Sequence, residues 1–595
     1  MRVADYIVKF IYETLGVEHV FGVVGGGAMF LNDAFAQNPK VKFISCHHEQ
    51  AAAMAASGYA RYSGKIGICC VTTGCGGTNA ITGVLGAYQD NIPMLIISGQ
   101  CKCRETMRYT GAPVRQLGVQ EADIIEIVKS ITKYACMVTD SQKIKYHLEE
   151  AIACAFKGSP GPVWLDIPLD IQNSRVEEEK LEGYKDVITK RCDANAINSC
   201  VKLLNESSRP IIIAGHGIRL ANSIAEFKKF IEETKIPIVF SELGLDILSS
   251  DYPLNLGKIG TKGNRAANFA LQNSDLIISI GSRLSVSSTG QEYDLFAREA
   301  KLVVVDINPN EHKKKTVKID LFVESDAKAF LEMMNYVGFW KVNSEWLTKC
   351  QEWKLKWPIC LPEYSNSEKV NLYYFLDRLS AKLKADSVII CDAGSSMFAT
   401  SQGIKIRESQ RLIFSAAQSE MGFTLPASVG VAFAKQAEVI GICGDGSLQM
   451  NIQELQTVKH HNIPVKLFVW NNDGYSTIRQ TQAKFFKDNH IGTDSSCGVS
   501  FPNLEKIADA YGIFYVKIPN SDYLELALNT VLQREGPVVC EVMCDRNQVI
   551  QPVISSKQLP NGKLVSCPSE DMYPFLPRQE FFREMIVKPE KSSDE

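Results

Sequence analysis

Short runs of mainly apolar residues recur along the chain, and the segments between them place their hydrophobic residues at a helical period. Uninterrupted apolar runs are typical of strands buried on both faces of a parallel sheet. Strands that alternate with helices in this way indicate an α/β fold. In the first part of the chain, the predicted strands are residues 20–24, 41–46, 66–72, 94–98 and 163–167.

The alternation continues along the chain and contains an internal repeat. The sequences GPVWLDIPLD (161–170) and GPVVCEVMCD (536–545) are each a Gly-Pro pair, a strand and an acidic residue. The repeat predicts that the first and third domains share one architecture. The further predicted strands are residues 210–214, 236–241, 276–280, 302–305, 388–391, 439–443 and 465–470.

Two segments interrupt the alternation and are interpreted as linkers. Residues 175–194 are rich in charge, and residues 345–369 are rich in Trp and Lys. The proline-containing C-terminal segment is loop-like, and it either covers a site or wraps around the surface. The predicted fold class is α/β, with three consecutive parallel-sheet domains. The predicted domains are residues 1–175, 195–345 and 370–550, followed by a tail of residues 551–595.

The composition of the 595 residues is ordinary for a globular protein, with 45% apolar and 22% charged residues. The net charge of −3 and the lack of a long basic run argue against nucleic acid or an anionic membrane as a partner. The N-terminus predicts an amphipathic helix rather than a secretory signal, and no apolar run reaches the roughly 18 residues that span a bilayer. The 18 cysteines form no paired CxxC sets, which indicates reduced thiols and a cytoplasmic location.

Two polar turns follow neighbouring strands of the third domain. GDGS (444–447) comes directly after strand 439–443, and NNDG (471–474) comes directly after strand 465–470. Open α/β sheets bind ligands at the carboxyl ends of their strands. The side chains of Asp445 and Asn472 offer the hard oxygen ligands that Mg²⁺ takes together with phosphate oxygens. These turns therefore predict a magnesium site that holds a phosphate compound.

The segment between the turns supports the same interpretation. Residues 448–461 have the length and spacing of a helix. Ser447 lies at the N-terminus of that helix, where free N–H groups and the helix dipole favour an anion. Gly446 and Gly474 let the backbone come close to a ligand, and Gly474 can offer its carbonyl. The plainer alternative is an ordinary strand–helix crossover with an aspartate in its turn.

The spacing of the two turns resembles the thiamine diphosphate (ThDP) signature of the pyruvate-decarboxylase and acetohydroxyacid-synthase superfamily. The resemblance implies that Mg²⁺ is bound by Asp445, Asn472 and the Gly474 carbonyl. It also implies a glutamate after the second strand, and Glu49 in CHHEQAAAMAASGYAR stands there. In this family the glutamate hydrogen-bonds N1′ of the aminopyrimidine, which promotes removal of the C2 proton. Taken alone, Glu49 would be a first-turn acid favoured by the helix dipole.

Other turns are predicted to contact the cofactor. Gly25 and Gly26 follow the first strand, although a tight strand-to-helix turn explains them equally well. Gly394, Ser395 and Ser396 follow strand 388–391 and can donate hydrogen bonds to the diphosphate. The two serines can also act as a helix N-cap, and both roles are compatible.

Met421, in the sequence SEMGFTLPASVG, matches the apolar side chain that supports the bent conformation of ThDP in this family. Core packing would be the usual role of a methionine. Tyr475, next to the second turn, is also assigned to cofactor binding. Because the two halves of a site come from different subunits in this superfamily, the resemblance implies a homodimer or homotetramer with sites at the subunit interface.

Three segments of the middle domain resemble the flavin domain of acetohydroxyacid synthases: residues 260–270, 274–284 and 301–311. Arg283 and Asp306 match flavin contacts, and the resemblance implies FAD without a redox role. The family pattern continues after the arginine with further Asp and Arg residues, which this chain lacks. A middle domain that serves only as a spacer is the alternative.

The resemblance to acetohydroxyacid synthases extends over nearly the whole chain. Gln100 and Lys133 match family residues near the substrate. Two aromatic residues of the synthases are absent, because Val119 and Thr481 stand in place of Phe and Trp. These changes predict a larger acceptor pocket, and Arg479 offers a cation that could meet a phosphate, although a surface arginine is the simpler interpretation.

The sequence therefore predicts an enzyme that decarboxylates a 2-keto acid, pyruvate in the first instance, and transfers the two-carbon unit to an acceptor carbonyl. The segments YSTIRQTQAKFF and KLVSCPSEDMYPFLP resemble synthase-like proteins of branched-sugar and polysaccharide pathways, which implies a keto-sugar nucleotide as acceptor. One alternative is acetolactate synthase proper, with a keto acid as acceptor. Another is an inactive ThDP-fold scaffold, which the intact Glu49, Asp445 and Asn472 argue against.

Overall fold

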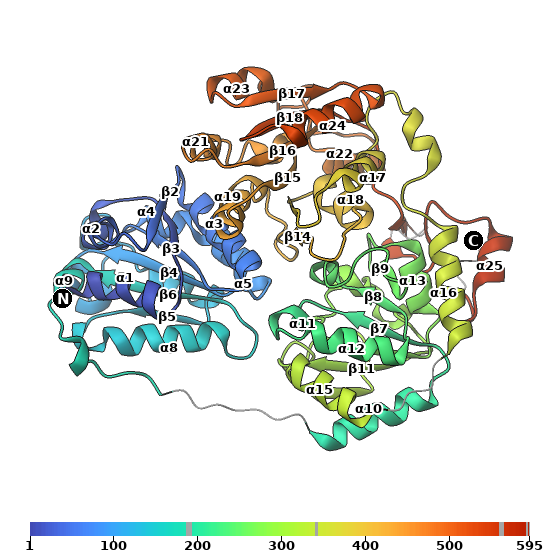
Figure 1. Cartoon of the computed structure of the whole chain (residues 1–595), viewed down its shortest axis with the longest axis horizontal. Helices are drawn as coiled ribbons and strands as arrows, with labels where there is room; N and C mark the ends of the chain where they lie inside the picture. Colours follow the sequence, from blue (N-terminus) through green and yellow to red (C-terminus); the bar gives the residue numbers. More distant parts are fainter. Residues whose placement is uncertain (186–192, 339–342, 559–563, 591–592, 594–595) are drawn as a thin grey trace.

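The computed structural model describes the chain except residues 186–192, 339–342, 559–563, 591–592 and 594–595. It contains three α/β domains, each built on a sheet of six parallel strands (Figure 1). The predicted fold class is therefore confirmed. No helix among the described residues is long and apolar enough to cross a membrane.

The N-terminal sheet has the strand order β2-β1-β3-β4-β6-β5. It contains all five predicted strands and one further strand, β5, which lies at an edge and is only partly buried. The strands are β1 (His19–Gly22), β2 (Lys42–Ser45), β3 (Gly67–Val71), β4 (Met94–Gln100), β5 (Tyr134–Met137) and β6 (Pro162–Pro168). The main helices are α1 (Val3–Glu13), α2 (Met29–Gln37), α3 (Glu49–Ser63), α5 (Ile81–Gln89) and α8 (Ile144–Phe156).

The third sheet repeats the first, because its order β14-β13-β15-β16-β18-β17 connects the strands in the same sequence. The predicted repeat of the two Gly-Pro strands is confirmed, since they are β6 and β18, at equivalent places. The strands are β13 (Val388–Cys391), β14 (Arg411–Ile413), β15 (Val439–Gly444), β16 (Val465–Asn471), β17 (Phe514–Ile518) and β18 (Val538–Met543). The main helices are α17 (Leu372–Lys382), α18 (Ser395–Gly403), α19 (Thr424–Lys435), α20 (Asp445–Leu448), α21 (Glu454–His460), α22 (Ser476–Phe486), α23 (Leu504–Ala510) and α24 (Leu524–Gln533).

The middle sheet has the order β9-β8-β7-β10-β11-β12, which is the order of dinucleotide-binding folds. Its switch point lies between β7 and β10. The strands are β7 (Pro210–Ala214), β8 (Ile238–Phe240), β9 (Asn255–Lys258), β10 (Leu276–Ile280), β11 (Lys301–Asp306) and β12 (Leu321–Glu324). The main helices are α10 (Ala194–Glu206), α12 (Ile224–Thr234), α13 (Arg265–Gln272), α15 (Ala327–Val337) and α16 (Ser344–Lys356).

The segment 345–369 was expected to be a linker, but it begins with α16, which packs on the middle sheet. Trp346 and Trp353 are buried there, and Nε1 of Trp346 donates a 2.9 Å hydrogen bond to the carbonyl of Pro210. Trp346, Cys350 and Trp353 recur at helical spacing, so the expectation was wrong because the charged residues between them masked an amphipathic helix.

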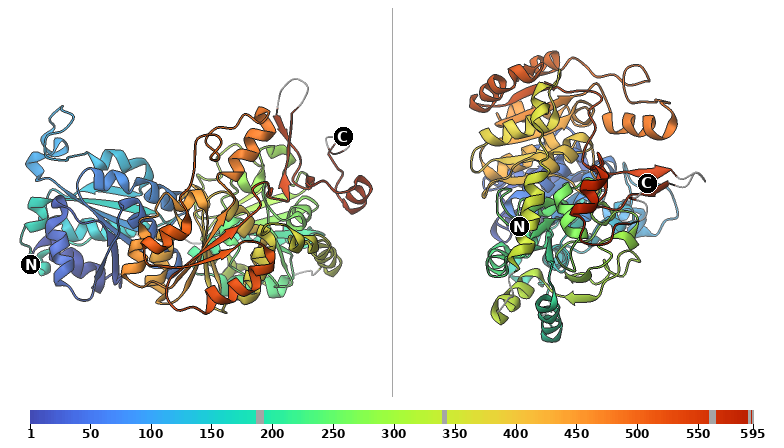
Figure 2. Two further views of the ribbon diagram at one scale, coloured as in Figure 1. Left: turned by 90° about the horizontal axis from the view of Figure 1, so that it is seen from above. Right: turned by 90° about the vertical axis from the view of Figure 1, so that its right-hand side faces the viewer.

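The C-terminal segment also packs against the middle domain (Figures 1 and 2). It forms two short antiparallel ribbons, β19 (Val553–Ile554) with β22 (Met572–Tyr573) and β20 (Ser556–Gln558) with β21 (Leu564–Ser566), and then helix α25 (Arg578–Glu584). The fully buried Glu570 accepts hydrogen bonds from Gln272 at 2.6 Å and Arg298 at 2.7 Å. Phe581 contributes to the same core as α13 and α16.

The helix predicted over residues 448–461 is interrupted, and that prediction was wrong in its extent. Helix α20 ends at Leu448, and α21 begins only at Glu454. The intervening Asn451 is buried, and its Nδ2 donates 2.9 and 3.0 Å hydrogen bonds to the carbonyl of Gly422 and to Oε1 of Gln50. These tertiary bonds replace the continuation of the helix.

The first and third domains pack against each other through α3 and α19, which approach closely. A Cβ atom on Gly430 would lie 1.8 Å from the carbonyl oxygen of Ala55, and one on Gly58 would lie 2.6 Å from that of Ala427. Glycines on both helices therefore permit the contact that joins the two domains.

We expect Gly430→Ala to destabilise the protein by about 1–3 kcal/mol, because the added methyl group forces α3 and α19 apart. Urea-induced unfolding followed by circular dichroism measures this change. Gly26→Ala is the matched control, since a Cβ at Gly26 would meet nothing within 4 Å. Equal stability of the two variants would contradict the importance of the close contact.

Candidate active site

The turns after β15 and β16 lie side by side, because these strands are neighbours in the third sheet. The carboxylate of Asp445 accepts a 2.8 Å hydrogen bond from the backbone N–H of Gly446 and a 3.0 Å bond from that of Gly474. Burial raises the pKa of Asp445 to about 6. The side chain of Asn472 is buried with its Oδ1 atom unpaired within the described part of the protein.

These oxygens suit a hard cation. A carboxylate and an unpaired buried amide oxygen at one sheet edge fit Mg²⁺, which uses few protein ligands beside phosphate oxygens and water. Within the described residues, no three His, Cys, Asp or Glu side chains gather in a way that could hold a metal ion.

The glycines of these turns are required by sterics. Gly474 has φ of +120°, and a Cβ on it would lie 1.9 Å from the carbonyl oxygen of Thr493. A Cβ on Gly446 would lie 2.3 Å from the ring of Tyr475, so the glycine lets this ring approach the turn. The two glycines thus let Thr493 and Tyr475 pack directly against the turns, which fixes the backbone around Asp445 and Asn472.

Asp392 connects three turns of the third domain, which contain Ser396, Gly422 and Ser447. Its carboxylate accepts hydrogen bonds from the hydroxyl of Ser447 at 2.6 Å and from that of Ser396 at 3.1 Å. Burial raises the pKa of Asp392 to about 6. The hydroxyl of Ser447 in turn accepts a 2.8 Å hydrogen bond from the N–H of Gly422. Both hydroxyls thus face the protein, whereas Ser395 remains at the surface of the turn and accepts a 3.5 Å bond from Asn472.

Met421 lies in a constrained turn between Ser419 and Gly422, which have φ of +51° and +81°. A positive φ is uncommon for serine, and such strain often occurs at functional sites. A Cβ on Gly422 would lie 2.6 Å from Cβ of Met450. The positions of Met421 and of the start of α19 are therefore fixed by the backbone.

Glu49 begins α3, and its side chain is largely buried. Oε2 accepts a 2.9 Å hydrogen bond from Nδ2 of Asn79. Gly25 packs against Thr72, since a Cβ on Gly25 would lie 2.6 Å from that side chain, whereas Gly26 is exposed. These residues form one polar corner at the carboxyl ends of β1, β2 and β3.

Contacts within the chain join this corner to the third domain. The N–H of His47 donates a 2.9 Å hydrogen bond to Glu454, and Gln50 accepts the bond from Asn451. The carboxylate of Glu49 itself is bonded within its own domain, to Asn79.

Gln100 and Lys133 are bonded to the protein. Nε2 of Gln100 donates to Asp166 at 3.0 Å and to the carbonyl of Ala122 at 3.1 Å, and its Oε1 accepts from the N–H of Cys101. Lys133 donates to the carbonyl of Lys157, and burial lowers the pKa of Lys133 to about 8. These contacts hold both side chains within the N-terminal domain, and their assignment near the substrate stays a prediction.

Arg479 is neither a surface arginine nor open to a phosphate. Its guanidinium is buried and donates 3.0 Å hydrogen bonds to the carbonyls of Asn472 and Asp473. It also lies 3.3 Å from the carboxylate of Asp494. The phosphate contact considered from the sequence is corrected, because Arg479 holds the second turn in place.

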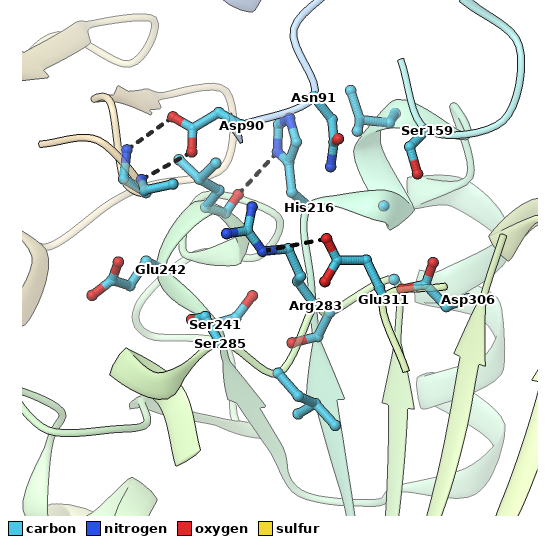
Figure 3. A pocket seen from close by; sticks show the side chains of 18 of the residues that line it. Asp90, Asn91, Ser159, His216, Ser241, Glu242, Arg283, Ser285, Asp306 and Glu311 are labelled. Carbon is cyan, nitrogen blue, oxygen red and sulfur yellow. Dashed lines mark hydrogen bonds and ion pairs between the residues drawn. The ribbon is translucent and has the colours of Figure 1, made fainter. Parts of the chain in front are cut away.

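Arg283 and Asp306 line a cavity of about 670 Å³ at the switch point of the middle sheet (Figure 3). Residues of the first and third domains also line the cavity, among them Asp90, Phe398 and Ala416. Oδ2 of Asp306 lies 3.2 Å from Nε2 of His312, and Oδ1 of Asp306 accepts a hydrogen bond from the N–H of Asn308. The guanidinium of Arg283 lies 3.9 Å from the carboxylate of Glu311 and donates a hydrogen bond to the carbonyl of Gln89.

Two further polar atoms at this cavity have no partner among the described residues. They are Nε2 of His216 and the hydroxyl of Ser282, and both are buried. Burial lowers the pKa of His216 to about 4, so its ring is neutral. Such atoms suit hydrogen bonds to a ligand of nucleotide size.

Several residues of the site were not predicted from the sequence. Asp392 directly follows strand 388–391 but had no role assigned from the sequence, and no pattern marked Asn79 or Asn451. Their importance depends on contacts with Ser447, Glu49 and Gly422 that only the folded chain creates.

Comparisons with known proteins agree with this geometry. The family description "Thiamine pyrophosphate enzyme, N-terminal TPP binding domain" matches residues 1–127, the central domain of the same enzymes matches residues 197–334, and their C-terminal TPP binding domain matches residues 392–542.

Similar proteins include acetolactate synthase 3 of Brassica napus, 32% identical over 573 residues, or 93% of this chain and 85% of that protein. Acetolactate synthase isozyme 2 large subunit of Escherichia coli (strain K12) is 32% identical over 545 residues, or 91% of this chain and 95% of that protein. This chain therefore belongs to the acetolactate synthase family of thiamine diphosphate-dependent enzymes, and it is a carboligase.

Proposed function

We propose that the enzyme decarboxylates pyruvate and transfers the resulting two-carbon unit to the carbonyl of a keto-sugar nucleotide. The observation that carries the catalytic part is the pair of oxygens at the ends of β15 and β16, the Asp445 carboxylate and the unpaired Oδ1 of Asn472. The acceptor is inferred from two aromatic residues that the synthases have and this chain lacks.

The site would hold the cofactor in two halves. Asp445, Asn472 and the Gly474 carbonyl would bind Mg²⁺, and Mg²⁺ would bind the diphosphate. Backbone N–H groups around Gly394, Ser395, Ser396, Gly446 and Ser447 would take the remaining phosphate oxygens. Gly25, Gly26 and Glu49 would receive the aminopyrimidine, with Met421 and Tyr475 supporting the cofactor.

When bound, ThDP supplies the nucleophilic carbon and stores the electron pair that decarboxylation leaves. Glu49 would hold a proton at N1′ of the aminopyrimidine, and Asn79 would fix its carboxylate through the 2.9 Å hydrogen bond. Asp392 and Arg479 touch no reacting atom. They would keep the diphosphate turns in position through Ser447, Ser396 and the carbonyl of Asn472.

We propose a homodimer whose sites combine Glu49 of one subunit with Asp445 of the other. Apolar side chains beside the polar corner around Glu49 are exposed in the single chain. Val24 is 60% exposed and Met29 is 50% exposed. Val119, which stands in place of a Phe of the synthases, is 84% exposed. Exposed apolar groups around a polar corner suit a subunit interface.

The acceptor region would be wider than in a synthase with aromatic residues. Val119 and Thr481 replace the two larger side chains, and Thr481 is exposed on α22. Loss of two aromatic walls removes contacts that favour a small keto acid and leaves room for a ring.

Purified protein with ThDP and Mg²⁺ should be given pyruvate alone and then pyruvate with a nucleoside-diphosphate 4-keto-6-deoxyhexose. We expect CO₂ release and a sugar product that is heavier by the two-carbon unit, detected by mass spectrometry. Efficient formation of acetolactate from pyruvate alone would favour acetolactate synthase proper. No CO₂ release in either reaction would favour a scaffold.

We also propose that FAD occupies the cavity lined by Arg283 and Asp306. Its volume of about 670 Å³ and the unpaired His216 and Ser282 atoms support a dinucleotide ligand. We expect the protein to release flavin on denaturation, measured by absorbance and fluorescence of the supernatant. Protein that remains colourless after incubation with FAD would contradict this proposal and indicate that the middle domain serves only as a spacer.

A further inference from the structure

A second cavity, of about 310 Å³, lies beside the cavity lined by Arg283 and Asp306 and shares Glu242, Val286, Ser287 and Phe398 with it. The middle domain forms one side, and the C-terminal ribbon β20–β21 with Ser569 forms another. Phe398 belongs to α18, the helix that starts at the diphosphate turn with Ser395. We name this space the hydroxyl pocket, after six of its lining residues: Thr261, Ser287, Thr289, Ser556, Ser566 and Ser569.

The hydroxyls of the pocket are largely available to a ligand. Within the described residues, the side chains of Thr261, Ser556, Ser566 and Ser569 make no hydrogen bond to the protein. Hydroxyl groups both donate and accept hydrogen bonds, so they match a ligand that carries hydroxyls itself. The remaining wall is apolar and suits the C–H face of a ring, and it includes Val286, Leu295, Phe398 and Ile554.

Lys262 provides the pocket with an ammonium group that lies within 4.0 Å of no carboxylate among the described side chains, although Glu242 is close enough to act on its charge. Its ammonium lies 3.1 Å from the centroid of the Phe398 ring. Burial, together with the nearby ammonium of Lys258, lowers the pKa of Lys262 to about 7. Lys258 is itself fully buried and donates a 2.7 Å hydrogen bond to Ser401.

The charge balance argues against a phosphate in this pocket. Glu242 and Glu292 also line it, and the ammonium of Lys258 lies 3.9 Å from Glu242, so two ammonium groups are balanced by two carboxyl groups. Burial raises the pKa of Glu242, and the nearby Lys258 opposes this shift. A neutral hydroxylated compound with a carbonyl oxygen uses these donors and acceptors better than an anion does.

We propose that the hydroxyl pocket binds the sugar ring of the acceptor, a neutral hydroxylated carbonyl compound, and that Lys262 donates a hydrogen bond to one of its oxygens. This inference rests on the proposed function, because it assigns a place to the acceptor of that reaction. The C-terminal segment thereby gains a role, since Ser556, Ser566 and Ser569 come from it.

Binding can be measured without catalysis. Saturation-transfer NMR with a nucleoside-diphosphate 4-keto-6-deoxyhexose, in the absence of pyruvate, reports on the sugar protons. We expect strong signals from the sugar ring with the wild-type enzyme. Lys262→Met should weaken the affinity about tenfold, because the hydrogen bond from the Lys262 amino group is lost. Thr261→Val, which keeps the shape of the side chain, should weaken it about threefold.

Lys318→Met is the matched control, since the Lys318 side chain is 87% exposed and lies outside the pocket. Thermal melting of each variant shows whether it is folded. Wild-type protein without sugar-ring signals, or equal affinities in the Lys262, Thr261 and Lys318 variants, would overturn the inference. Failure of the proposed function is seen separately, as absence of CO₂ release from pyruvate by the wild-type enzyme.

Discussion

Replacing Glu49 with Gln is expected to slow CO₂ release from pyruvate by about 10²–10⁴-fold, the usual contribution of a positioned acid–base group. Glutamine has nearly the same shape and can still accept the hydrogen bond from Asn79. It cannot hold the proton at N1′, however, so activation of the cofactor is lost while its binding is kept. The assay is initial-rate CO₂ release at saturating ThDP and Mg²⁺.

Glu13→Gln is the control for this variant, because the Glu13 side chain is 54% exposed on α1. Fluorescence titration with ThDP should give similar affinities for the wild type and Glu49→Gln. Full turnover by Glu49→Gln would contradict an acid–base role of Glu49.

The second large effect is expected at the metal turn. Asp445→Asn should raise the apparent Kd for Mg²⁺ by about 100-fold or more, since outer-shell partners alone are worth about 10–100-fold. The amide still accepts from one backbone N–H, but the negative charge that faces the cation is lost. Calorimetric titration of Mg²⁺ in the presence of ThDP measures this affinity.

Asp473→Asn provides a control in the same turn. The side chain of Asp473 is 55% exposed and forms a 3.0 Å ion pair with Arg546. We expect its Mg²⁺ affinity to stay within about twofold of the wild type. Equal losses in the two variants would indicate a general electrostatic effect instead of a specific ligand.

The core strands could be read from the sequence because burial on both faces leaves an unbroken apolar run. Strands β13, β15 and β16 lie within one residue of their predicted bounds. The edge strands β14 and β17 were missed, since β14 is very short and β17 is half exposed and mixes Lys and Tyr with apolar residues. A strand with one open face gives a weaker apolar signal.

The site was predictable where it consists of local turns and unpredictable where it depends on long-range bonds. Asp445 and Asn472 directly follow strands, so their common location follows from parallel pairing. The interruption of the helix at Asn451 needs Gly422 and Gln50, and the burial of Arg479 needs Asp494. The spacing of residues along the sequence does not predict such long-range contacts.

The most direct test of the account is complementation between Glu49→Gln and Asp445→Asn subunits. If each site takes its proton-holding glutamate from one subunit and its metal ligand from the other, a mixed dimer contains one intact site. Randomly reassembled dimers should then recover about a quarter of the wild-type CO₂ release, because half of them are mixed. Activity that stays at the level of the two inactive parents, in mixtures proven to contain mixed dimers, would contradict a site shared between subunits.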